Sequence, residues 1–418
     1  MTFRGDSRVN LDRFWNTMER SNEIGIGRPG GLSRLTLSDA DREMRDLFVS
    51  WCEEADLTVE VDELGSIFAR RAGECDDLPP VMIGSHLDTQ VNGGRFDGIV
   101  GVLAGLEVVR TLNDLGHVTR RPLVLVNWTN EEGARFSPPM VASGAFVGKY
   151  HPDWVRDLVD DEGIRFGDEL ERIGYHGTRS ARGCCVDAYF ELHIEQGPIL
   201  DAEGRTVGVV TGGYPSHGMR IRFEGQTAHT GPTPMDLRHN ALIAGARWLT
   251  AVDDIGWDFA VHDGKATGSR LTAWPNKPGI LSETAECVAD VRHPDPVTAG
   301  VMAEKMRRAA FSAAAIAGCT AVVEDEWSWG GAIFDQSLID LIRSEAIRQG
   351  HNWRDIQSQA GHDAYHMAMH CPTAMIFTPC RGGITHNNAE TCSPEDLRAG
   401  MDILLHSAVT RLNRQYIT

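Results

Sequence analysis

Long apolar runs are absent from this chain of 418 residues. None approaches the roughly 20 consecutive apolar residues that a helix needs to cross a bilayer. The first residues, MTFRGDSRVNLDRFW, also lack the basic start and apolar core of a secretory signal peptide. We therefore expect a soluble, cytoplasmic protein that has no membrane partner.

Positively charged residues are scarce. The chain has 40 Lys and Arg and 59 Asp and Glu, which gives a net charge of −19. An acidic surface repels phosphate backbones, which argues against a nucleic-acid partner. The nine cysteines are an odd number without repeated spacing, and only Cys184 and Cys185 are adjacent. This pattern is neither a disulfide framework nor a zinc finger, and it is typical of free thiols in a reducing compartment.

The chain is too long for one ordinary core, so two domains are expected. Its first third alternates helix and strand patterns, and the last part resumes them. Apolar strand patterns that are separated by helices predict an α/β sheet covered on both faces. Such sheets bind ligands beyond the carboxyl ends of their strands. The predicted helices are 37–56, opened by Ser38, 97–114, 335–349 and 394–414, and the predicted strands are 81–86, 121–133, 187–198 and 373–379.

The middle of the chain has a different pattern. Strands at 217–225, 283–293 and 320–327 alternate polar and apolar residues, and helical stretches lie near 236–251 and 295–317. Alternation favours an antiparallel sheet with helices on one face. We therefore predict an α/β domain, 1–213 and 330–418, that is interrupted by an inserted α+β domain, 214–329.

Polar residues gather at the ends of the predicted α/β strands. His86 and Asp88 are two positions apart and share a face of a strand, so His86 could ligate a metal while Asp88 orients its imidazole. The alternative is a capped strand end with a surface aspartate. Asp97, between glycines at a predicted helix start, is either a helix cap or a carboxylate that bridges two cations.

Glu131 and Glu132 end an otherwise apolar strand. Adjacent buried carboxylates repel each other and lose solvation, and a nearby cation would remove that penalty. One glutamate could then ligate a metal while the other acts as a general base; the alternative is a solvated loop start. Taken alone, His193 is typical of a core histidine and His386 of an inert loop histidine.

Together these residues supply three histidines, one aspartate and one or two glutamates at one edge of a sheet. That set suits two divalent ions such as Zn²⁺, Mn²⁺, Co²⁺ or Ni²⁺. In the inserted domain, His229 lies in a predicted loop and Arg292 ends a strand. Arginine is the preferred partner of a substrate carboxylate, although a surface loop and a surface ion pair would also explain these two residues.

Six ordered motifs now identify a resemblance that covers nearly the whole chain. They are GSHLDTQVNGGRFDG, NWTNEEGARFSP, ELHIEQGP, AHTGPTPMDLRHNAL, AGHDA and THNNAE. In this order they resemble the amidase/carbamoylase branch of the M20 metallopeptidase family, which includes N-carbamoyl-L-amino-acid hydrolases, β-ureidopropionases and allantoate amidohydrolases.

The resemblance implies a role for each residue. His86 and His193 would hold one metal ion, Glu132 and His386 a second, and Asp97 would bridge the two. Glu131 would be the general base and Asp88 would support His86. His229, from the partner subunit, would stabilise the oxyanion. Substrate contacts would come from Gln196, Arg292 and the backbone near Gly361. The inserted domain would act as a lid and form a homodimer.

The chain departs from the family pattern in its substrate residues. An asparagine expected thirteen positions before Arg292 is replaced by Gly279, and Asn276 is its nearest candidate substitute. The polar residues expected at Ser216–His217–Gly218 are altered as well. The sequence therefore predicts a binuclear amidohydrolase that cleaves an N-carbamoyl amino acid. The alternatives are hydrolysis of allantoate or an N-acyl amino acid, a metallo-exopeptidase, and a metal-dependent binding protein without catalysis, against which Glu131 argues.

Overall fold

The structure, a computed structural model, describes residues 3–415. The chain divides into two units, the first made of Met1–Thr211 with Ile333–Thr418 and the second of Gly212–Ala332. Within the described residues, no helix has both the length and the apolar character needed to cross a membrane.

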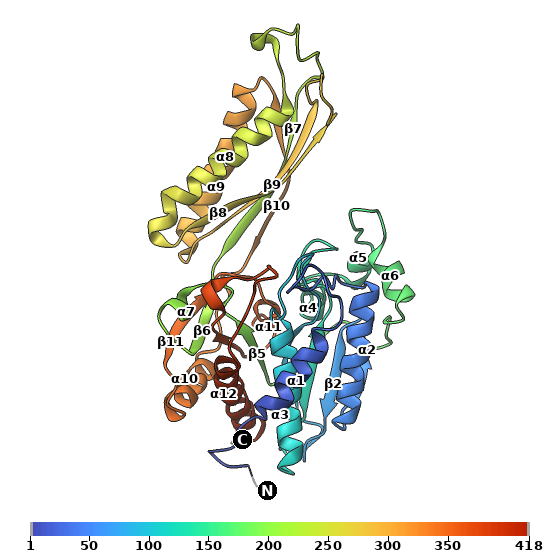
Figure 1. Cartoon of the computed structure of the whole chain (residues 1–418), viewed down its shortest axis with the longest axis vertical. Coiled ribbons are helices and arrows are strands. Elements are labelled where there is room, and N and C mark those ends of the chain that lie inside the picture. Colours follow the sequence, from blue (N-terminus) through green and yellow to red (C-terminus); the bar gives the residue numbers. More distant parts are fainter. Residues whose placement is uncertain (1–2, 416–418) are drawn as a thin grey trace. The chain divides into compact units, whose positions relative to one another are not determined.

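The first unit is built on an eight-stranded sheet with the order β1-β2-β4-β3-β5-β12-β6-β11 (Figure 1). Its central strands β4, β3, β5 and β12 run parallel to one another, whereas β2 pairs antiparallel with β4 and β6 with β12. These four central strands are buried throughout, as their unbroken apolar sequences predict. The strands are β1 Thr58–Val61, β2 Ile67–Arg71, β3 Val81–His86, β4 Leu123–Trp128, β5 Ala188–Ile194, β6 Val207–Gly213, β11 Trp353–Ser358 and β12 Thr373–Thr378.

Helices α3 and α12 pack against the central strands. Helix α1 packs on α3, and helix α10 packs on α12. Helix α2 begins where its sequence predicts, because the side chain of Ser38 accepts a hydrogen bond from the amide of Asp41. The helices of this unit are α1 Leu11–Ser21, α2 Asp39–Glu54, α3 Ile99–Asp114, α4 Val141–Phe146, α5 Pro152–Arg156, α6 Phe166–Arg172, α7 Ile199–Ala202, α10 Gln336–Arg348, α11 Asp363–Met367, α12 Pro394–Leu412 and the 3₁₀ turn η3 Arg381–Gly383.

Strand β5 stops at Ile194 and not at 198, and two further predicted boundaries near the polar residues were wrong. Strand β4 stops at Trp128, and Asn130 follows with a left-handed φ of 60°, so Glu131 and Glu132 lie in a turn beyond the strand. Helix α3 starts at Ile99 with Gly98 in the capping position, so Asp97 precedes the cap and does not cap the helix. Both corrections leave these carboxylates free to serve a site.

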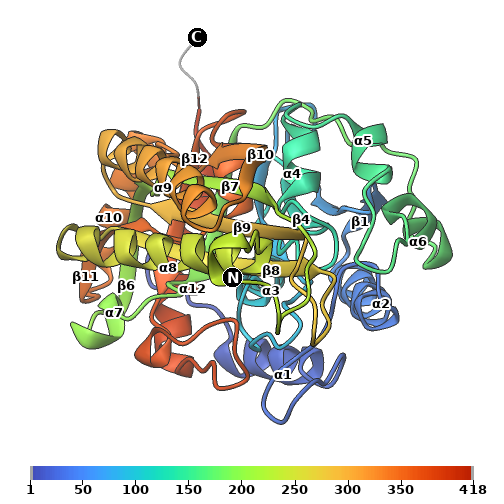
Figure 2. The ribbon, with the colours of Figure 1, turned by 90° about the horizontal axis from the view of Figure 1, so that it is seen from above.

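The second unit has a four-stranded antiparallel sheet with the order β10-β7-β9-β8. Its strands are β7 Ser216–Glu224, β8 Lys265–Trp274, β9 Thr284–Arg292 and β10 Thr320–Trp329. Helices α8 Ala241–Phe259 and α9 Pro296–Ile316 lie side by side and pack on this sheet (Figure 2). The second unit also contains two short 3₁₀ turns, η1 Met235–Leu237 and η2 Ala260–His262. The predicted α+β fold is confirmed, but β8 was missed because most of its residues are exposed and show no apolar alternation.

Candidate metal centre

His86 and His193 end up at the same edge of the sheet because β3 and β5 are parallel neighbours. The Nδ1 atom of His86 lies 2.9 Å from the carbonyl oxygen of Asp88, and Nδ1 of His193 lies 2.9 Å from that of Ile194. A carbonyl oxygen only accepts, so both imidazoles carry their proton on Nδ1. Nε2 of each ring is then the nitrogen that can serve as a metal ligand, and Nε2 of His193 also accepts a hydrogen bond from the amide of Gly98 at 3.1 Å.

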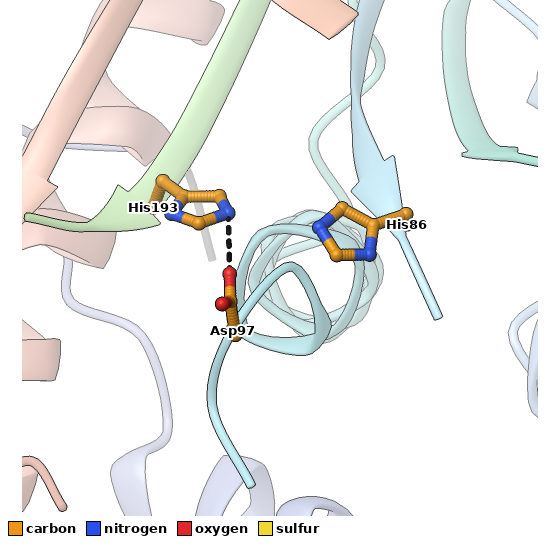
Figure 3. Close-up of side chains that lie close together, drawn as sticks. All are labelled: His86, Asp97 and His193. Atoms are coloured by element: carbon orange, nitrogen blue, oxygen red, sulfur yellow. Dashed lines mark ion pairs between the residues drawn. The ribbon is translucent and has the colours of Figure 1, made fainter. Parts of the chain in front are cut away.

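Asp97 lies between the histidines, in the loop that leads into α3 (Figure 3). Its Oδ1 is 3.3 Å from Nε2 of His193, and its Oδ2 is 3.1 Å from Nε2 of His386. His386 is also 3.3 Å from Oε2 of Glu132. The five predicted ligand residues thus form two overlapping groups, His86–Asp97–His193 and Asp97–Glu132–His386, in each of which the ligand atoms lie within 4.8 Å of one another.

The chemistry of these donors fits divalent cations. Three imidazole nitrogens and two carboxylates form a mixed nitrogen and oxygen set, which borderline ions such as Zn²⁺ prefer. Asp97 belongs to both groups, as expected of a carboxylate shared by two ions a few ångströms apart. The structure therefore holds a candidate metal-binding site in its first unit.

Gly98 keeps the space beside His86 clear. A Cβ atom at this position would lie 2.2 Å from Nε2 of His86, and the φ of Gly98 is +68°, which disfavours any other residue. The glycine next to Asp97 is therefore required both by the backbone and by the ligand atom that it faces.

The two adjacent glutamates point to different partners. The Oε2 atom of Glu131 lies 3.4 Å from Nε2 of His86. Glu132 instead faces His386 and accepts a hydrogen bond from Nε2 of Gln90 at 2.9 Å. The Asp88 carboxylate lies beneath this turn, with its oxygens 3.4 and 3.3 Å from the amides of Glu131 and Glu132. Glu131 belongs to neither ligand group, which leaves its carboxylate available for other chemistry.

Burial and like charges shift the titration of this cluster. Burial raises the pKa of Glu131 well above its usual value, and the negative charges of Asp363 and Glu132 raise it further. Burial opposes the charged form of His86, but Asp88 and Glu132 outweigh it and raise its pKa to about 9. In the same way, burial is outweighed at His386 by Asp97 and Glu132, which raise its pKa to about 11. These crowded charges are those of a site built to receive cations.

Several residues near the centre were not predicted. Glu390 accepts hydrogen bonds from the amides of Phe96 and Asp97, and Thr385 contacts both Asp97 and Glu390. Both residues belong to the THNNAE motif, of which only His386 was singled out, because the partners Phe96 and Asp97 are almost 300 positions away and no local pattern reveals these contacts. Gln196, predicted to contact substrate, has its Nε2 2.9 and 3.1 Å from the two carboxylate oxygens of Asp97. Gly361 lies in the loop that precedes α11.

The remaining predicted residues belong to the second unit. His229 is exposed, and its segment runs antiparallel to the segment of Ile280, with the amide of Thr230 donating to the carbonyl of Gly279 at 3.2 Å. The residue that replaces the expected asparagine is thus a neighbour of the His229 segment. Asn276 is exposed in the loop after β8. At the end of β9, the guanidinium of Arg292 donates to Asp290 at 3.0 Å and lies 4.8 Å above the ring of Trp329.

Comparison with known proteins places these residues in a family context. The sequence profile of the peptidase family M20/M25/M40 matches residues 82–410. An N-carbamoyl-L-amino-acid amidohydrolase of Rhizobium meliloti is 43% identical over 402 residues, which are 96% of each chain. The allantoate amidohydrolase of Bacillus subtilis is 27% identical over 384 residues, or 91% of this chain and 93% of that one. The crystal structure of a hydantoinase/carbamoylase family amidase from Burkholderia vietnamiensis aligns with this chain with a TM-score of 0.94 at 42% sequence identity. The alignment covers 99% of this chain and 100% of that chain.

Proposed function

Because this chain belongs to the M20/M25/M40 peptidase family, we propose that it is a binuclear metal-dependent amidohydrolase of N-carbamoyl amino acids. The products would be the amino acid, ammonia and carbon dioxide. The 43% identity with an N-carbamoyl-L-amino-acid amidohydrolase over 96% of both chains supports this substrate class. Hydrolysis of another linear amide is the alternative, since the 27% identical relative is an allantoate amidohydrolase.

The observation that carries the proposal is the divergence of Glu131 and Glu132. Glu132 faces His386 and joins a ligand group, whereas Glu131 is buried beside His86 and joins none. A protein that only bound metal would have no use for a second buried carboxylate next to its ligands. The arrangement is the one that a hydrolase needs for a general base.

The chemistry then follows from the residues of the site. His86, His193 and Asp97 would hold one cation and Asp97, Glu132 and His386 the other. When bound, the two cations would lower the pKa of a shared water and polarise the substrate carbonyl. Glu131 takes a proton from the attacking water and returns it to the leaving nitrogen, a role that its place beside His86 and outside both ligand groups suits.

The second unit would complete the reaction. We assign stabilisation of the oxyanion to His229, and such a donor is typically worth about 3–4 kcal/mol. Arg292 would bind the substrate carboxylate, held in orientation by Asp290 and Trp329. Asn276, Gln196 and the backbone at Gly361 would make further contacts. A homodimer formed through this unit, with His229 supplied by the partner subunit, belongs to the same proposal.

A substrate panel with ammonia detection tests the function. The panel contains N-carbamoyl-L-amino acids, their D-enantiomers, allantoate, N-acetyl amino acids and dipeptides, each with metal-reconstituted protein. We expect ammonia from N-carbamoyl-L-amino acids, and none from the N-acetyl or dipeptide substrates, whose cleavage is read as free amino acid. If allantoate alone yields ammonia, the substrate is allantoate and not an N-carbamoyl amino acid. If dipeptides alone yield free amino acids, the protein is an exopeptidase.

A further inference from the structure

Two loops that are distant in sequence meet at the carboxylate of Glu390. Its Oε1 accepts hydrogen bonds from the backbone amides of Phe96 at 2.8 Å and Asp97 at 3.1 Å. Its Oε2 lies 3.0 Å from the hydroxyl of Thr385. Glu390 is only 4% exposed, so these partners stand in for the water that a carboxylate normally binds.

The hydroxyl of Thr385 extends the same contact to the candidate ligand. It lies 2.9 Å from Oδ2 of Asp97, the oxygen that faces His386. One glutamate and one threonine therefore connect the backbone of the Asp97 loop, the Asp97 carboxylate and the segment that carries His386.

The backbone of the Asp97 loop leaves space for the Glu390 side chain at Gly94. A Cβ atom on Gly94 would lie 1.9 Å from the carboxyl carbon of Glu390. The chain thus leaves out a side chain at Gly94, and the Glu390 carboxylate fills the space.

His386 needs this support more than the other histidines do. It lies in a loop outside any helix or strand, has a φ of 50°, and its side chain is 45% exposed, whereas those of His86 and His193 are 1% exposed. Among the described residues, no hydrogen bond to Nδ1 of His386 fixes its ring in the way that a backbone carbonyl fixes the rings of His86 and His193.

We propose that Glu390 is a positioning residue that fastens the Asp97 loop to the His386 loop and thereby builds the half-site of Asp97, Glu132 and His386. The inference rests on the proposed binuclear function and deepens it. Loss of Glu390 weakens cation binding at this half-site, because Asp97 and His386 are no longer held where both can contact the same cation. The half-site of His86 and His193, held on two strands, keeps more of its affinity.

The experiment measures the affinity of purified, metal-free protein for Mn²⁺ and Zn²⁺ by isothermal titration calorimetry, with metal content checked by mass spectrometry. We expect Glu390→Ala to weaken one of the two binding steps by roughly 10- to 100-fold, the usual effect of losing a partner of a metal ligand, and to leave the other step closer to its wild-type affinity. Glu390→Gln should restore most of the affinity, because its amide oxygen accepts from Phe96 and Asp97 while its NH₂ donates to Thr385.

Two further variants separate positioning from folding. Glu395→Ala removes an exposed glutamate from the first turn of α12, and it should bind metal like the wild type. Thr385→Val keeps the size of the side chain and removes only the hydroxyl, so it should weaken the same step less than Glu390→Ala does. Thermal melting of the metal-free proteins shows whether each variant folds.

The outcomes separate this inference from the proposed function. Wild-type affinity of both Glu390→Ala and Thr385→Val would overturn the inference and leave the function standing. If Glu390→Ala does not fold, Thr385→Val decides, and wild-type affinity in that variant rejects the inference. A wild-type protein that binds no divalent ion would overturn both.

Discussion

The Nδ1 atom of His86 lies 2.9 Å from the carbonyl oxygen of Asp88, whereas the Asp88 carboxylate is 3.7 Å from the same nitrogen. The backbone of Asp88 therefore orients the imidazole, which the sequence had led us to expect of its side chain. The carboxylate accepts a hydrogen bond from Thr36 at 2.7 Å and faces the amides of Glu131 and Glu132. Asp88 thus connects His86, through its carbonyl, to the turn of Glu131 and Glu132, through its carboxylate.

Asp88→Ala should disturb the glutamate turn and spare the His86 ring. We expect kcat to fall by about 10- to 100-fold, in line with the loss of other supporting contacts near metals. Long-range ¹⁵N–¹H NMR should still find the proton of His86 on Nδ1. A change of tautomer in this variant would show that the carboxylate orients the ring after all.

Glu131→Gln should remove the proposed general base while leaving both ligand groups intact. We expect kcat to fall by roughly 10²- to 10⁴-fold, the usual contribution of general acid–base catalysis, with unchanged metal content. Glu132→Gln is the matched comparison. It makes the same substitution at the adjacent position, where the side chain is a proposed metal ligand, so this variant should bind less metal. Ammonia release and mass spectrometry measure the two effects, and full turnover by Glu131→Gln would refute the mechanism.

Gly98→Ala should abolish metal binding at the half-site of His86. Its Cβ would lie 2.2 Å from the ligand nitrogen, so the loop or the imidazole must move. Gly116→Ala is the control, because Gly116 also has a positive φ, +59°, but has no atom within 4 Å of the added Cβ. Both variants bear similar backbone strain, about 1 kcal/mol or more, and only Gly98→Ala should lose metal in a calorimetric titration. Equal metal binding by the two variants would contradict the geometry.

The sequence predicted most of the elements that carry this centre. The apolar runs before His86 and His193 predicted β3 and β5, and parallel neighbours in a sheet present the same end, so both histidines could be placed at one edge. The pair of glutamates was predicted to divide into a ligand and a base, and the structure points their side chains to different histidines.

Other features had no signal in the sequence. The turn that separates Glu131 from β4 depends on the left-handed backbone of Asn130, which strand periodicity does not reveal. The bond between Glu390 and the amide of Phe96 joins residues 294 positions apart, and only the fold brings them together. Strand β8 is an exposed edge whose side chains follow no alternation, so its pairing with β9 could not be read from the pattern of the chain.

Asp62 should make stability depend on pH. It is buried between β1 and β2, where its Oδ1 accepts from the amides of Leu64 and Ser66, and burial raises its pKa to about 6. The folded pKa exceeds the unfolded value of about 4, so the folded state binds this proton more tightly. The resulting stabilisation is complete below about pH 4 and is lost as the pH rises through about 6.

Asp62→Asn keeps an acceptor for both amides and removes the titration. Between pH 5 and 7.5, the wild type should lose about 1.4 kcal/mol of unfolding free energy relative to this variant. Urea denaturation of both metal-free proteins at the two pH values gives the difference. A constant difference between the two proteins would show that Asp62 keeps its ordinary pKa in the folded state.

The most direct test of the account is a titration of divalent metal into metal-free protein with an N-carbamoyl-L-amino acid present, while ammonia is recorded. We predict no ammonia before metal is added, and a rate that rises to a plateau near two equivalents, since Asp97 belongs to two ligand groups. Undiminished ammonia release by the metal-free protein, or none at saturating metal with any ureido acid, would contradict the central claim.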